Sequence, residues 1–482
     1  MTNQPIPTFA IMGHPNAGKS SVVATLTEND RIEIDQRAGT TTRSDHYPVV
    51  IDGETIIEFI DTPGFQNPSA ILEWFQTHHH ERDLAGAFIA AHRQERNFAH
   101  DCALLEPVAA GAGIIFVVDG SKRIKEKDRT EMELLRLTGR PRMVILNNLS
   151  NNDRYISAWQ DALSKCFNSV RAFNAHRATY DERIKLLNAL KSIDQRWEAR
   201  LAATIEAFQR DWERRIDLTV TTIIELLLAA LAFRVTRVVR VSDLRGGKRD
   251  REAIQQELRN AFQDGLREVE IKAQHEIRAH FRHHFWHLPP DSLLQKDLFS
   301  DEVGQALGLK RTQIVVAGMA AGATAGVGVD LSLGLATLGA AALVGATTGG
   351  LIGAFGGAAL AKFDIQRTLG VERFSLGPVT NPQFAFILLD RILLYSARAM
   401  NWSHGRKAAD EQARNKVADK AVAQKRGFTE ELTSQQHQLL AKYFAAARKG
   451  QRVDKYEDDC RQILANLLRG LSLSEIDSRT DL

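Results

Sequence analysis

The chain has 482 residues, of which 44% are hydrophobic and 25% are charged. This balance is typical of folded globular proteins and excludes an intrinsically disordered chain, and the length suggests about three domains. With 62 Lys and Arg against 59 Asp and Glu, the net charge is +3, so we do not expect nucleic acid as a partner on overall charge. Three widely separated cysteines and a polar N-terminus without a signal-peptide pattern favour a reducing, cytosolic compartment.

The first 190 residues alternate short apolar runs with helical patterns, which is typical of an α/β fold. Asp52-Gly53 separates the second run from the third and predicts a hairpin turn. A mostly parallel six-stranded sheet with one antiparallel edge is therefore expected. Its predicted strands are Phe9–Met12, Tyr47–Ile51, Thr55–Ile60, Ile114–Val118, Met143–Leu146 and Val170–Phe173.

A phosphate-binding loop follows the first predicted strand and precedes a helix. The residues that match the pattern G-x-x-x-x-G-K-[ST] are Gly13, His14, Pro15, Asn16, Ala17, Gly18, Lys19 and Ser20. Backbone amides of such a loop, and of Ser21 just beyond it, turn toward phosphate oxygens at a helix N-terminus. We expect Lys19 to reach the β- and γ-phosphates and the Ser20 hydroxyl to bind Mg²⁺.

Two further segments carry residues of the same chemistry. Asp61 begins the tetrapeptide D-T-P-G at the end of the third predicted strand, where it can hold Mg²⁺ through water. The amide of Gly64 can meet the γ-phosphate. Residues 39–43 lie between these segments in a predicted loop, and a Thr hydroxyl there can complete the Mg²⁺ shell when the γ-phosphate is present.

These three pieces resemble the Era/TrmE-like branch of bacterial translation-factor-class GTPases. The resemblance covers about residues 1–190 and rests on the sequences GHPNAGKS at 13–20, TTR at 41–43 and DTPGF at 61–65. It implies a GTP/GDP switch cycle, a Mg²⁺ cofactor and hydrolysis of GTP. It assigns the switch-loop Mg²⁺ ligand to Thr42, with Thr41 as the alternative.

The resemblance also bears on catalysis. Phe65 stands where Ras-type enzymes place a water-orienting Gln, so the chain resembles hydrophobic-substituted GTPases. Asn16 matches the loop Asn that helps potassium-activated relatives hold K⁺ near the phosphates. We therefore list Lys19, Thr42, Gly64 and Asn16 as the candidate catalytic residues and expect K⁺-stimulated hydrolysis. The alternative for Asn16 is an amide that only stabilises the loop.

The base-reading motif departs from the family pattern. Where the family has N-K-x-D, whose Asp accepts hydrogen bonds from guanine, this chain has Asn147-Asn148-Leu149-Ser150. Loss of that charged acceptor costs about 1.5–3 kcal/mol of discrimination. Asp153 can substitute only with a rearranged loop. We still assign base contacts to Asn147 and Ser150, and to Asn174 and Ala175, which match the family's S-A motif weakly.

From about Asp181 the pattern becomes helical. Apolar residues recur every three or four positions from Ile184 to Ile216 and predict one long amphipathic helix. A second helical pattern covers 254–285, so residues 191–311 are expected to form an antiparallel helical pair or stalk. Between the two lie basic residues expected on a helix face that contacts anionic lipid or only solvent: Arg234, Arg237, Arg240, Lys248, Arg249 and Arg251.

Residues 312–361 contain 12 Gly and 14 Ala among 50 residues and a single charge, Asp330. Glycines recur at four-residue intervals, as in membrane helices whose backbones pack closely. We expect a Gly-zipper helical hairpin that inserts in a membrane or lies against it, with a packed core as the alternative. Residues 362–482 are expected to be helical, so the region after the GTPase domain is predicted to be all-α.

The whole chain resembles a family of bacterial proteins that join this GTPase module to a C-terminal domain of unknown function, numbered 3482. The likeness rests on residues 374–378, Asn381-Pro382 and 388–391. Histidines at 78–80, 275, 280, 283, 284 and 287 lack a completing carboxylate or Cys, so a solvated or interfacial cluster is favoured over a metal site.

The hypothesis from sequence is a membrane-associated GTPase on the cytoplasmic face of the inner membrane, with a protein partner or a second copy as further candidates. Three alternatives remain open. They are a dynamin-like membrane remodeller, a soluble ribosome or RNA assembly factor, and a nucleotide-binding membrane or pore module without turnover.

Overall fold

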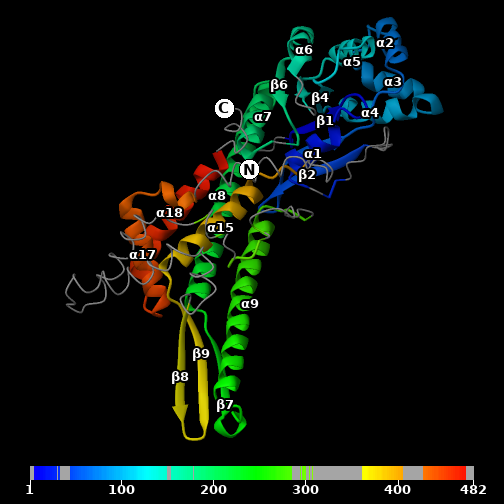
Figure 1. Ribbon diagram of the computed structural model, residues 1–482. Coiled ribbons are helices and arrows are strands. Elements are labelled where there is room, and N and C mark those ends of the chain that lie inside the picture. Colours follow the sequence, from blue (N-terminus) through cyan, green and yellow to red (C-terminus); the bar gives the residue numbers. More distant parts are fainter. Residues whose placement is uncertain are drawn as a thin grey trace. The chain divides into compact units, whose positions relative to one another are not determined.

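The computed structural model describes residues 5–29, 31–32, 44–148, 153–176, 178–284, 294, 296–299, 303, 307, 361–404 and 427–473. The chain divides into two compact units (Figure 1). The first comprises Met1–Arg214 with two short later segments, Arg282–Phe285 and Met400–Asp410. The second comprises the intervening and following residues. The predicted Gly-rich hairpin lies outside the described residues up to residue 360.

The first unit contains the predicted six-stranded sheet, in the order β2-β3-β1-β4-β5-β6. Only β2 runs antiparallel to its neighbour, so the mostly parallel sheet with one antiparallel edge is confirmed. Asp52 and Gly53 form the tight turn at this edge, both with positive φ. The strands are β1 Thr8–Met12, β2 Asp45–Ile51, β3 Glu54–Asp61, β4 Gly113–Asp119, β5 Arg142–Asn147 and β6 Ser169–Phe173.

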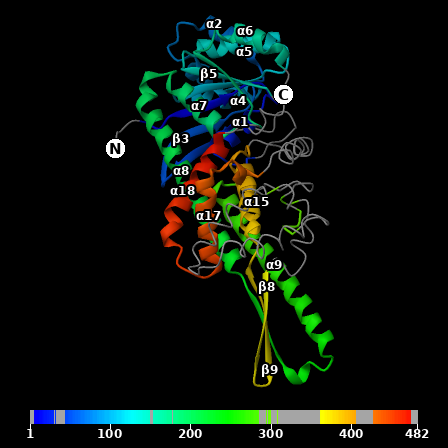
Figure 2. The ribbon, with the colours of Figure 1, turned by 60° about the vertical axis from the view of Figure 1, so that its left-hand side comes forward.

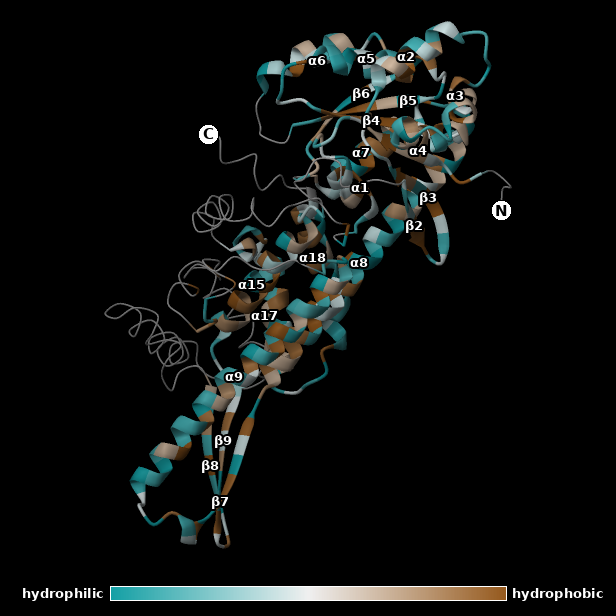
Figure 3. Cartoon of the chain, turned by 90° about the vertical axis from the view of Figure 1, so that its right-hand side faces the viewer, coloured by the Kyte–Doolittle hydropathy of each residue, from teal (hydrophilic) through white to brown (hydrophobic). Residues whose placement is uncertain are grey.

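Helices cover both faces of the sheet because successive strand residues point to opposite sides. Phe9 and Ile11 of β1 join one apolar core, whereas Ala10 and Met12 join the other. Figure 3 shows the hydrophobic colouring of the inner strands β4 and β5. The helices around the sheet are α1 Lys19–Thr27, α2 Pro68–Thr77, α3 Leu84–His92, α4 Ala99–Ala109, α5 Glu126–Leu137, α6 Ile156–Leu163 and α7 Tyr180–Lys191.

The single long helix predicted from Ile184 to Ile216 is wrong, because the chain breaks between α7 and α8 (Glu198–Ala232). Asp194 accepts a hydrogen bond from the Arg196 amide and starts a short 3-10 turn there. The apolar period continues across the break because both sides cover the same core. Trp197, on that turn, packs against Phe9 with ring centroids 5.0 Å apart, and the first turns of α8 complete the core of the first unit.

The second unit contains the end of α8 and the helices α9 Lys248–His280, α15 Pro382–Met400, α17 Ser434–Arg448 and α18 Asp454–Leu473 (Figure 2). The Phe233 ring, just after α8, contacts Phe262 in the middle of α9, and Thr222 Oγ1, earlier in α8, lies 3.1 Å from His280 Nε2 at the end of α9. Because earlier residues of α8 contact later residues of α9, the two helices run antiparallel, as predicted. The helical region is confirmed. The predicted domain boundaries at residues 190, 311 and 361 remain predictions.

The all-α description of this region needs a correction, because the second unit also contains a three-stranded antiparallel sheet. Its order is β7-β9-β8, with β7 at Val235–Arg240, β8 at Ala361–Thr368 and β9 at Val371–Val379. The predicted helix face of Arg234, Arg237 and Arg240 is therefore wrong. The run V-T-R-V-V-R is rich in β-branched residues, which favour a strand over a helix.

Candidate functional site

The phosphate-binding loop connects β1 to α1, as its sequence predicts. Gly13 has φ 141°, and a Cβ at this position would lie 2.2 Å from the Val117 carbonyl oxygen. Gly18 caps α1 with φ 89°, and Asn16 adopts φ 66°, a conformation that Asn tolerates better than most residues. The first helical hydrogen bond runs from the Val22 amide to the Gly18 carbonyl, so the preceding amides at the helix N-terminus are available to an anion.

Lys19 lies inside this loop rather than in solvent. Its ammonium donates to the Gly13 carbonyl at 3.1 Å and to the His14 carbonyl at 3.4 Å. Burial lowers the pKa of Lys19, and the nearby carboxylates of Asp61 and Glu131 oppose that effect. The arrangement holds a cation where β- and γ-phosphate oxygens would replace the two carbonyls.

Ser20 and Asp61, the two predicted Mg²⁺ ligands within the described residues, lie together. The Ser20 hydroxyl donates to Asp61 Oδ2 at 2.7 Å, and Asp61 is almost fully buried. Burial raises the pKa of Asp61, while Lys19 and the Ser20 hydrogen bond oppose that rise. The other oxygen, Oδ1, is buried without a hydrogen-bond partner among the described residues. A hydroxyl oxygen beside an incompletely satisfied carboxylate fits the oxygen ligands that Mg²⁺ prefers.

The D-T-P-G segment turns directly against the phosphate loop. The Thr62 hydroxyl donates to the Ile11 carbonyl at 2.7 Å. A Cβ on Gly64 would lie 2.8 Å from the ring of Pro15, so only glycine fits this approach. The Phe65 side chain is buried in the apolar core, which agrees with a residue that cannot orient water. Gly64 is therefore placed beside the loop where its amide was predicted to meet the γ-phosphate.

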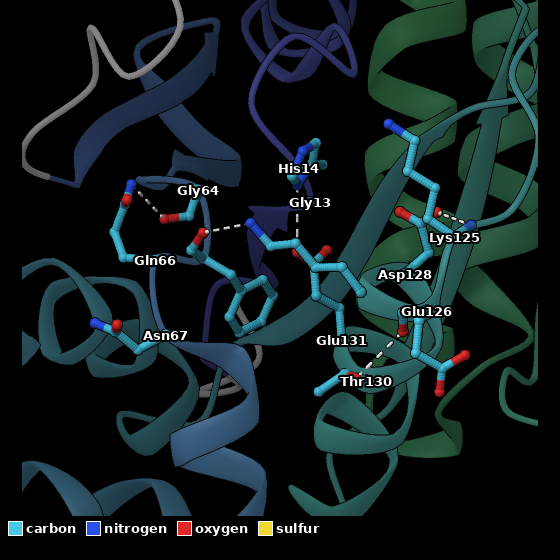
Figure 4. A network of polar contacts seen from close by, with 12 residues as sticks. Gly13, His14, Gly64, Gln66, Asn67, Lys125, Glu126, Asp128, Thr130 and Glu131 are labelled. Atoms are coloured by element: carbon cyan, nitrogen blue, oxygen red, sulfur yellow. Dashed lines mark hydrogen bonds and ion pairs between the residues drawn. The ribbon is translucent and has the colours of Figure 1, made fainter.

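The phosphate side contains one residue that the sequence analysis missed, Glu131 of α5. It is fully buried, and in the described part of the chain neither carboxylate oxygen has a hydrogen-bond partner. The nearest cationic candidate is His14, whose Nδ1 lies 3.5 Å from Glu131 Oε1 (Figure 4). Burial raises the pKa of Glu131, while His14 and Lys127 oppose the rise. In the sequence, Glu131 stands four residues after Lys127 in a run rich in charged residues, a pattern typical of a solvated helix face, and therefore contains no signal of burial.

The same helix also contacts the segment that follows Gly64. Lys127 donates from Nζ to the Phe65 carbonyl at 3.4 Å. The amides of Gln66 and Asn67 donate to Asp101 Oδ1 at 3.0 and 3.3 Å, and Asp101 is fully buried. Two buried or half-buried charged side chains therefore fix the backbone just beyond Gly64.

On the base side, Asn147 bridges two loops instead of facing solvent. Its Nδ2 donates to the Ala17 carbonyl at 3.0 Å, and its Oδ1 accepts from the Ala175 amide at 3.3 Å. Asn147 is fully buried at the end of β5. This residue therefore ties the phosphate loop to the predicted S-A position.

The remaining base-side residues form a chain of amide contacts. Asn148 donates from Nδ2 to Asp153 Oδ1 at 2.7 Å. The Asn174 side chain donates to the Asn148 carbonyl at 2.8 Å, and the His176 amide donates to Asn174 Oδ1 at 3.0 Å. Asn148 thereby contacts both Asp153 and Asn174, and the substitution of Asp153 for the family's base-reading Asp stays a prediction.

Ala175 has a second role that the sequence did not predict. Its carbonyl accepts from the Thr25 hydroxyl at 2.9 Å and from the Ser403 hydroxyl. Ser403 follows α15 in the chain but belongs to the first compact unit. A residue of the C-terminal half therefore contacts the loop predicted to hold the base.

The other predicted site residues fall in two groups. Ser21 is buried in the first turn of α1, so its backbone amide is the part that can face a phosphate. Thr41, Thr42 and Ser150 lie outside the described residues, and their assignments stay predictions. Within the described ranges, no group of three or more His, Cys, Asp or Glu side chains is placed to hold a metal.

Two family profiles match the chain. Residues 8–148 match the family described as "50S ribosome-binding GTPase". Residues 160–469 match the family described as "Domain of unknown function (DUF3482)".

Curated relatives are similar to this chain over less than a third of its length. GTPase Der of Rhodopirellula baltica is 41% identical over 82 residues, which are 16% of this chain and 18% of that protein. The tRNA modification GTPase MnmE of Lactobacillus delbrueckii subsp. bulgaricus is 29% identical over 149 residues, which are 31% of this chain and 26% of that protein. GTPase Era of Clostridioides difficile is 29% identical over 145 residues, which are 30% of this chain and 40% of that protein. The chain thus spans less than half the length of these relatives.

Among solved structures, Era in complex with MgGDPNP and nucleotides 1506–1542 of 16S ribosomal RNA has 15% identity and a TM-score of 0.28, covering 39% of this chain and 56% of that one. An Era variant from Aquifex aeolicus bound to GDP and AlF4⁻ has 18% identity and a TM-score of 0.28, and the match covers 39% of this chain and 57% of that one. Because the second profile spans well over half of the sequence, the chain belongs to the DUF3482 family, and it carries an Era-like P-loop GTPase domain at its N-terminus.

Proposed function

We propose that this protein is a Mg²⁺-dependent GTP-hydrolysing switch that works at a membrane surface. The observation that carries the hydrolytic part is the pair Ser20 and Asp61, in contact at 2.7 Å with one buried carboxylate oxygen left over. This pair lies at the N-terminus of α1, beside the buried ammonium of Lys19. Hydroxyl, carboxylate and ammonium together match the needs of a nucleoside triphosphate with its metal.

The chain's own residues have distinct roles in this proposal. Ser20 and Asp61 would hold Mg²⁺, which would neutralise charge on the phosphate oxygens. Lys19 exchanges its two loop carbonyls for the β- and γ-phosphates. Gly64 brings its amide toward the γ-phosphate because no side chain separates it from Pro15. Phe65 packs in the core and leaves the attacking water to other groups.

Potassium is the proposed additional charge at the transition state. Asn16 is exposed on the phosphate loop, and its side chain forms no hydrogen bond with any described residue. The amide is therefore available to a cation beside the phosphates, although the left-handed backbone at Asn16 also explains the residue as a loop former. Turnover measured in K⁺ and in Na⁺ tests this part, since equal rates contradict it.

Guanine reading is assigned to Asp153. Its carboxylate is fixed by the Asn148 side chain, and the Asn148 backbone is fixed by Asn174. An Asp placed here can accept hydrogen bonds from the N1 and exocyclic amine of guanine, the role that the family gives to the Asp of N-K-x-D. The base loop then connects through Ala175 to Ser403, which offers a second route from nucleotide to the C-terminal region besides the switch loops.

The membrane part rests on the composition of residues 312–361, with their 12 Gly, 14 Ala and one charge. Glycine at four-residue intervals suits close helix packing in lipid. In the described part of the chain, no helix is long and apolar enough to cross a bilayer. A ribosomal role is the rival with independent support, because the N-terminal profile is described as 50S ribosome-binding and the Era complex contains 16S ribosomal RNA.

Phosphate release by the full chain tests the enzymatic part. We expect release from GTP in Mg²⁺, none in EDTA, and a preference for GTP over ATP. Tight GTP binding without release would instead indicate a nucleotide-binding module without turnover. The measurement needs no lipid, so its outcome is independent of the membrane proposal.

Membrane association is tested by flotation with vesicles followed by a carbonate wash, using the full chain and a deletion of residues 312–360. The deletion stops before Ala361 because that residue pairs with Val379 in the second sheet. Retention of the full chain alone supports a hairpin anchor. If neither chain floats and the full chain instead sediments with ribosomes, the ribosomal rival replaces the membrane proposal. Nucleotide-dependent tubulation of the vesicles would indicate a remodeller.

A further inference from the structure

The three-stranded sheet of the second unit has a highly exposed turn between β8 and β9. β8 and β9 are joined by Leu369 and Gly370, where Gly370 has φ 78° and allows the tight turn. The Leu369 side chain is fully exposed. Val241, just after β7, donates its amide to the Gly370 carbonyl at 3.0 Å and is itself 47% exposed. Two exposed apolar residues are therefore located at this end of the sheet, which Figures 1 and 2 show as the end farthest from α17 and α18.

One face of the sheet is covered and the other is open. Glu372, Phe374 and Leu376 of β9 are buried, and α9 packs on this side. The alternate residue Arg373 is exposed and pairs in register with Val238, which is 53% exposed. Arg240 lies on the same open face, two residues further along β7.

Positive charge is concentrated in this sheet and in the loop before α9. Residues 234–251 and 362–373 contain ten Lys or Arg and four Asp or Glu, a surplus of six. The whole chain has a net charge of +3, so the remainder carries −3. A local surplus of this size in a nearly neutral protein marks a surface for an anionic partner.

The acidic side chains do not neutralise the open face. Glu372 is buried on the α9 side, where its carboxylate accepts hydrogen bonds from Arg251 Nε at 2.9 Å and Arg251 Nη2 at 2.8 Å. It also pairs with Arg367 at 3.2 Å. Arg237 pairs with Glu257 of α9. By contrast, six exposed cations of these two ranges form no ion pair with any described residue: Arg234, Arg240, Arg245, Arg249, Lys362 and Arg373.

Exposed apolar residues inside a basic surface decide between two anionic partners. A bilayer offers anionic headgroups above an apolar layer, which suits Leu369 and Val241 surrounded by arginines. A nucleic acid offers phosphates and base faces, and single strands are usually held by exposed aromatic rings. The aromatic side chains of this sheet are Phe363 and Phe374, of which Phe374 is fully buried and Phe363 half-buried. The chemistry favours lipid.

We propose that this end of the sheet, the basic tip (Val238, Arg240, Val241, Arg245, Leu369 and Arg373), binds an anionic lipid bilayer. The arginines contact headgroup phosphates, and Leu369 and Val241 enter the headgroup boundary. The inference rests on the proposed membrane association and specifies its lipid chemistry. It assigns a peripheral contact separate from the Gly-rich segment, which enters the sheet at Ala361, the end of β8 opposite to Leu369.

The test is flotation of the full chain with neutral and with anionic vesicles, made of phosphatidylcholine alone or of an equimolar mixture with phosphatidylglycerol. We expect at least tenfold tighter binding to the anionic vesicles, reduced by salt. The double variant Arg240→Gln/Arg373→Gln is expected to lose about tenfold or more on anionic vesicles, since each cation near such a surface contributes about fivefold. Leu369→Asn is expected to lose about tenfold on the same vesicles.

The matched control is Arg171→Gln/Arg210→Gln, which removes two exposed cations from β6 and α8. It should bind both vesicles like the parent. Equal binding of the parent to neutral and anionic vesicles, or no effect of the tip variants, overturns the basic tip while leaving membrane association intact. No binding to either vesicle overturns membrane association itself. Loss of ribosomal RNA binding in the tip variants, with unchanged vesicle binding, would assign the surface to RNA.

Discussion

The phosphate half and the base half of the nucleotide site are built in different ways. The phosphate half depends on backbone geometry at Gly13, Gly18 and Gly64. At Gly13 and Gly64 a Cβ would collide with a neighbouring segment, and at Gly18 the positive φ disfavours any residue other than glycine. The base half depends on side-chain amides that hold one loop to another through Asn147 and Asn148. Backbone requirements restrict the residue type at each position, whereas an amide network allows the position of a reading group to change.

This difference explains how the chain can keep a complete phosphate loop beside a degenerate base motif. Asn147 retains the structural part of N-K-x-D, because it connects the Ala17 carbonyl to the Ala175 amide. The reading carboxylate can then come from a later position as long as a side chain such as Asn148 fixes it. Mutations in the phosphate half should therefore affect all nucleotides alike, and mutations in the base half should affect them unequally.

The largest effect is expected for Lys19→Ala. This variant removes the only ammonium held by the phosphate-loop carbonyls in the described structure. We expect kcat/KM for GTP hydrolysis to fall by about 10²–10³-fold, as for loss of one group that stabilises transition-state charge. Phosphate release measures it.

The uniformity of this loss is the informative result. Binding of GTP, ATP and XTP should weaken by similar factors in Lys19→Ala, because phosphate contacts are common to all three. Lys185→Ala, at an exposed position of α7, is the matched control and should leave turnover unchanged. A variant that selectively lost GTP would contradict the division into two halves.

Gly64→Ala should have the next largest effect. The new Cβ would lie 2.8 Å from the Pro15 ring, so the D-T-P-G segment must move away from the phosphate loop. A displacement of this kind can cost about 10²-fold in kcat. Nucleotide binding should change much less, since the base half is untouched. The control is Gly470→Ala, where a Cβ meets nothing within 4 Å.

Asp153→Asn tests the base half. Removing the charged acceptor should weaken GTP by roughly 10- to 100-fold, the value of a charge-assisted pair of about 1.5–3 kcal/mol. Xanthine has a carbonyl where guanine has its exocyclic amine, so the Asn amide can donate to it. XTP should therefore bind the variant better than the parent, as measured by competition with a fluorescent nucleotide.

Tighter binding of XTP to the variant distinguishes a base-contacting role of Asp153 from a purely structural one. A structural role for Asp153 would weaken all nucleotides and produce no preference for XTP. Asp161→Asn, an exposed change on α6, should leave the order of affinities unchanged. Unaltered GTP binding in Asp153→Asn would show that another group reads the base.

The sequence predicted what depends on backbone pattern. All six strands of the first sheet, its antiparallel edge, the phosphate loop and the position of Asp61 follow from short apolar runs and fixed glycine spacing. The contact between Ser20 and Asp61, 41 residues apart in the sequence, follows because β1 and β3 are parallel neighbours. Asp61 ends β3, and Ser20 lies just after the loop that leaves the carboxyl end of β1. These features are local rules that the sheet topology brings together.

What the sequence did not predict depends on burial or on pairing between distant segments. The three-stranded sheet of the second unit joins β7 to β9 across more than 130 residues of chain, and V-T-R-V-V-R can be mistaken for a basic helix face. Ser403 reaches Ala175 across a separation of 228 positions. Glu131 has the sequence context of an exposed helical residue, and only the fold shows that its carboxylate is enclosed.

The smallest effect is expected for Glu131→Gln. This variant tests whether the buried Glu131 carboxylate beside the phosphate loop lowers the free energy of unfolding. Burial raises the pKa of Glu131 above its ordinary value of 4.5. Below pH 4.5 the side chain is neutral in both folded and unfolded chains, so parent and variant should have similar stability. As pH rises from 4.5 through the raised folded pKa, the unfolded chain ionises first, and the parent loses stability that the variant keeps.

We therefore expect the free energy of unfolding of Glu131→Gln to exceed that of the parent by about 1–3 kcal/mol at pH 8, with the difference disappearing in acid. Chemical denaturation at a series of pH values measures it. Glu106→Gln, on the exposed face of α4, is the control and should show no such trend. If the variant were instead less stable at pH 8, the carboxylate would be ionised and stabilised by His14 and Lys127. The contact between His14 and α5 would then be an ion pair that supports the phosphate loop, and loop residues with side chains would matter as much as its glycines.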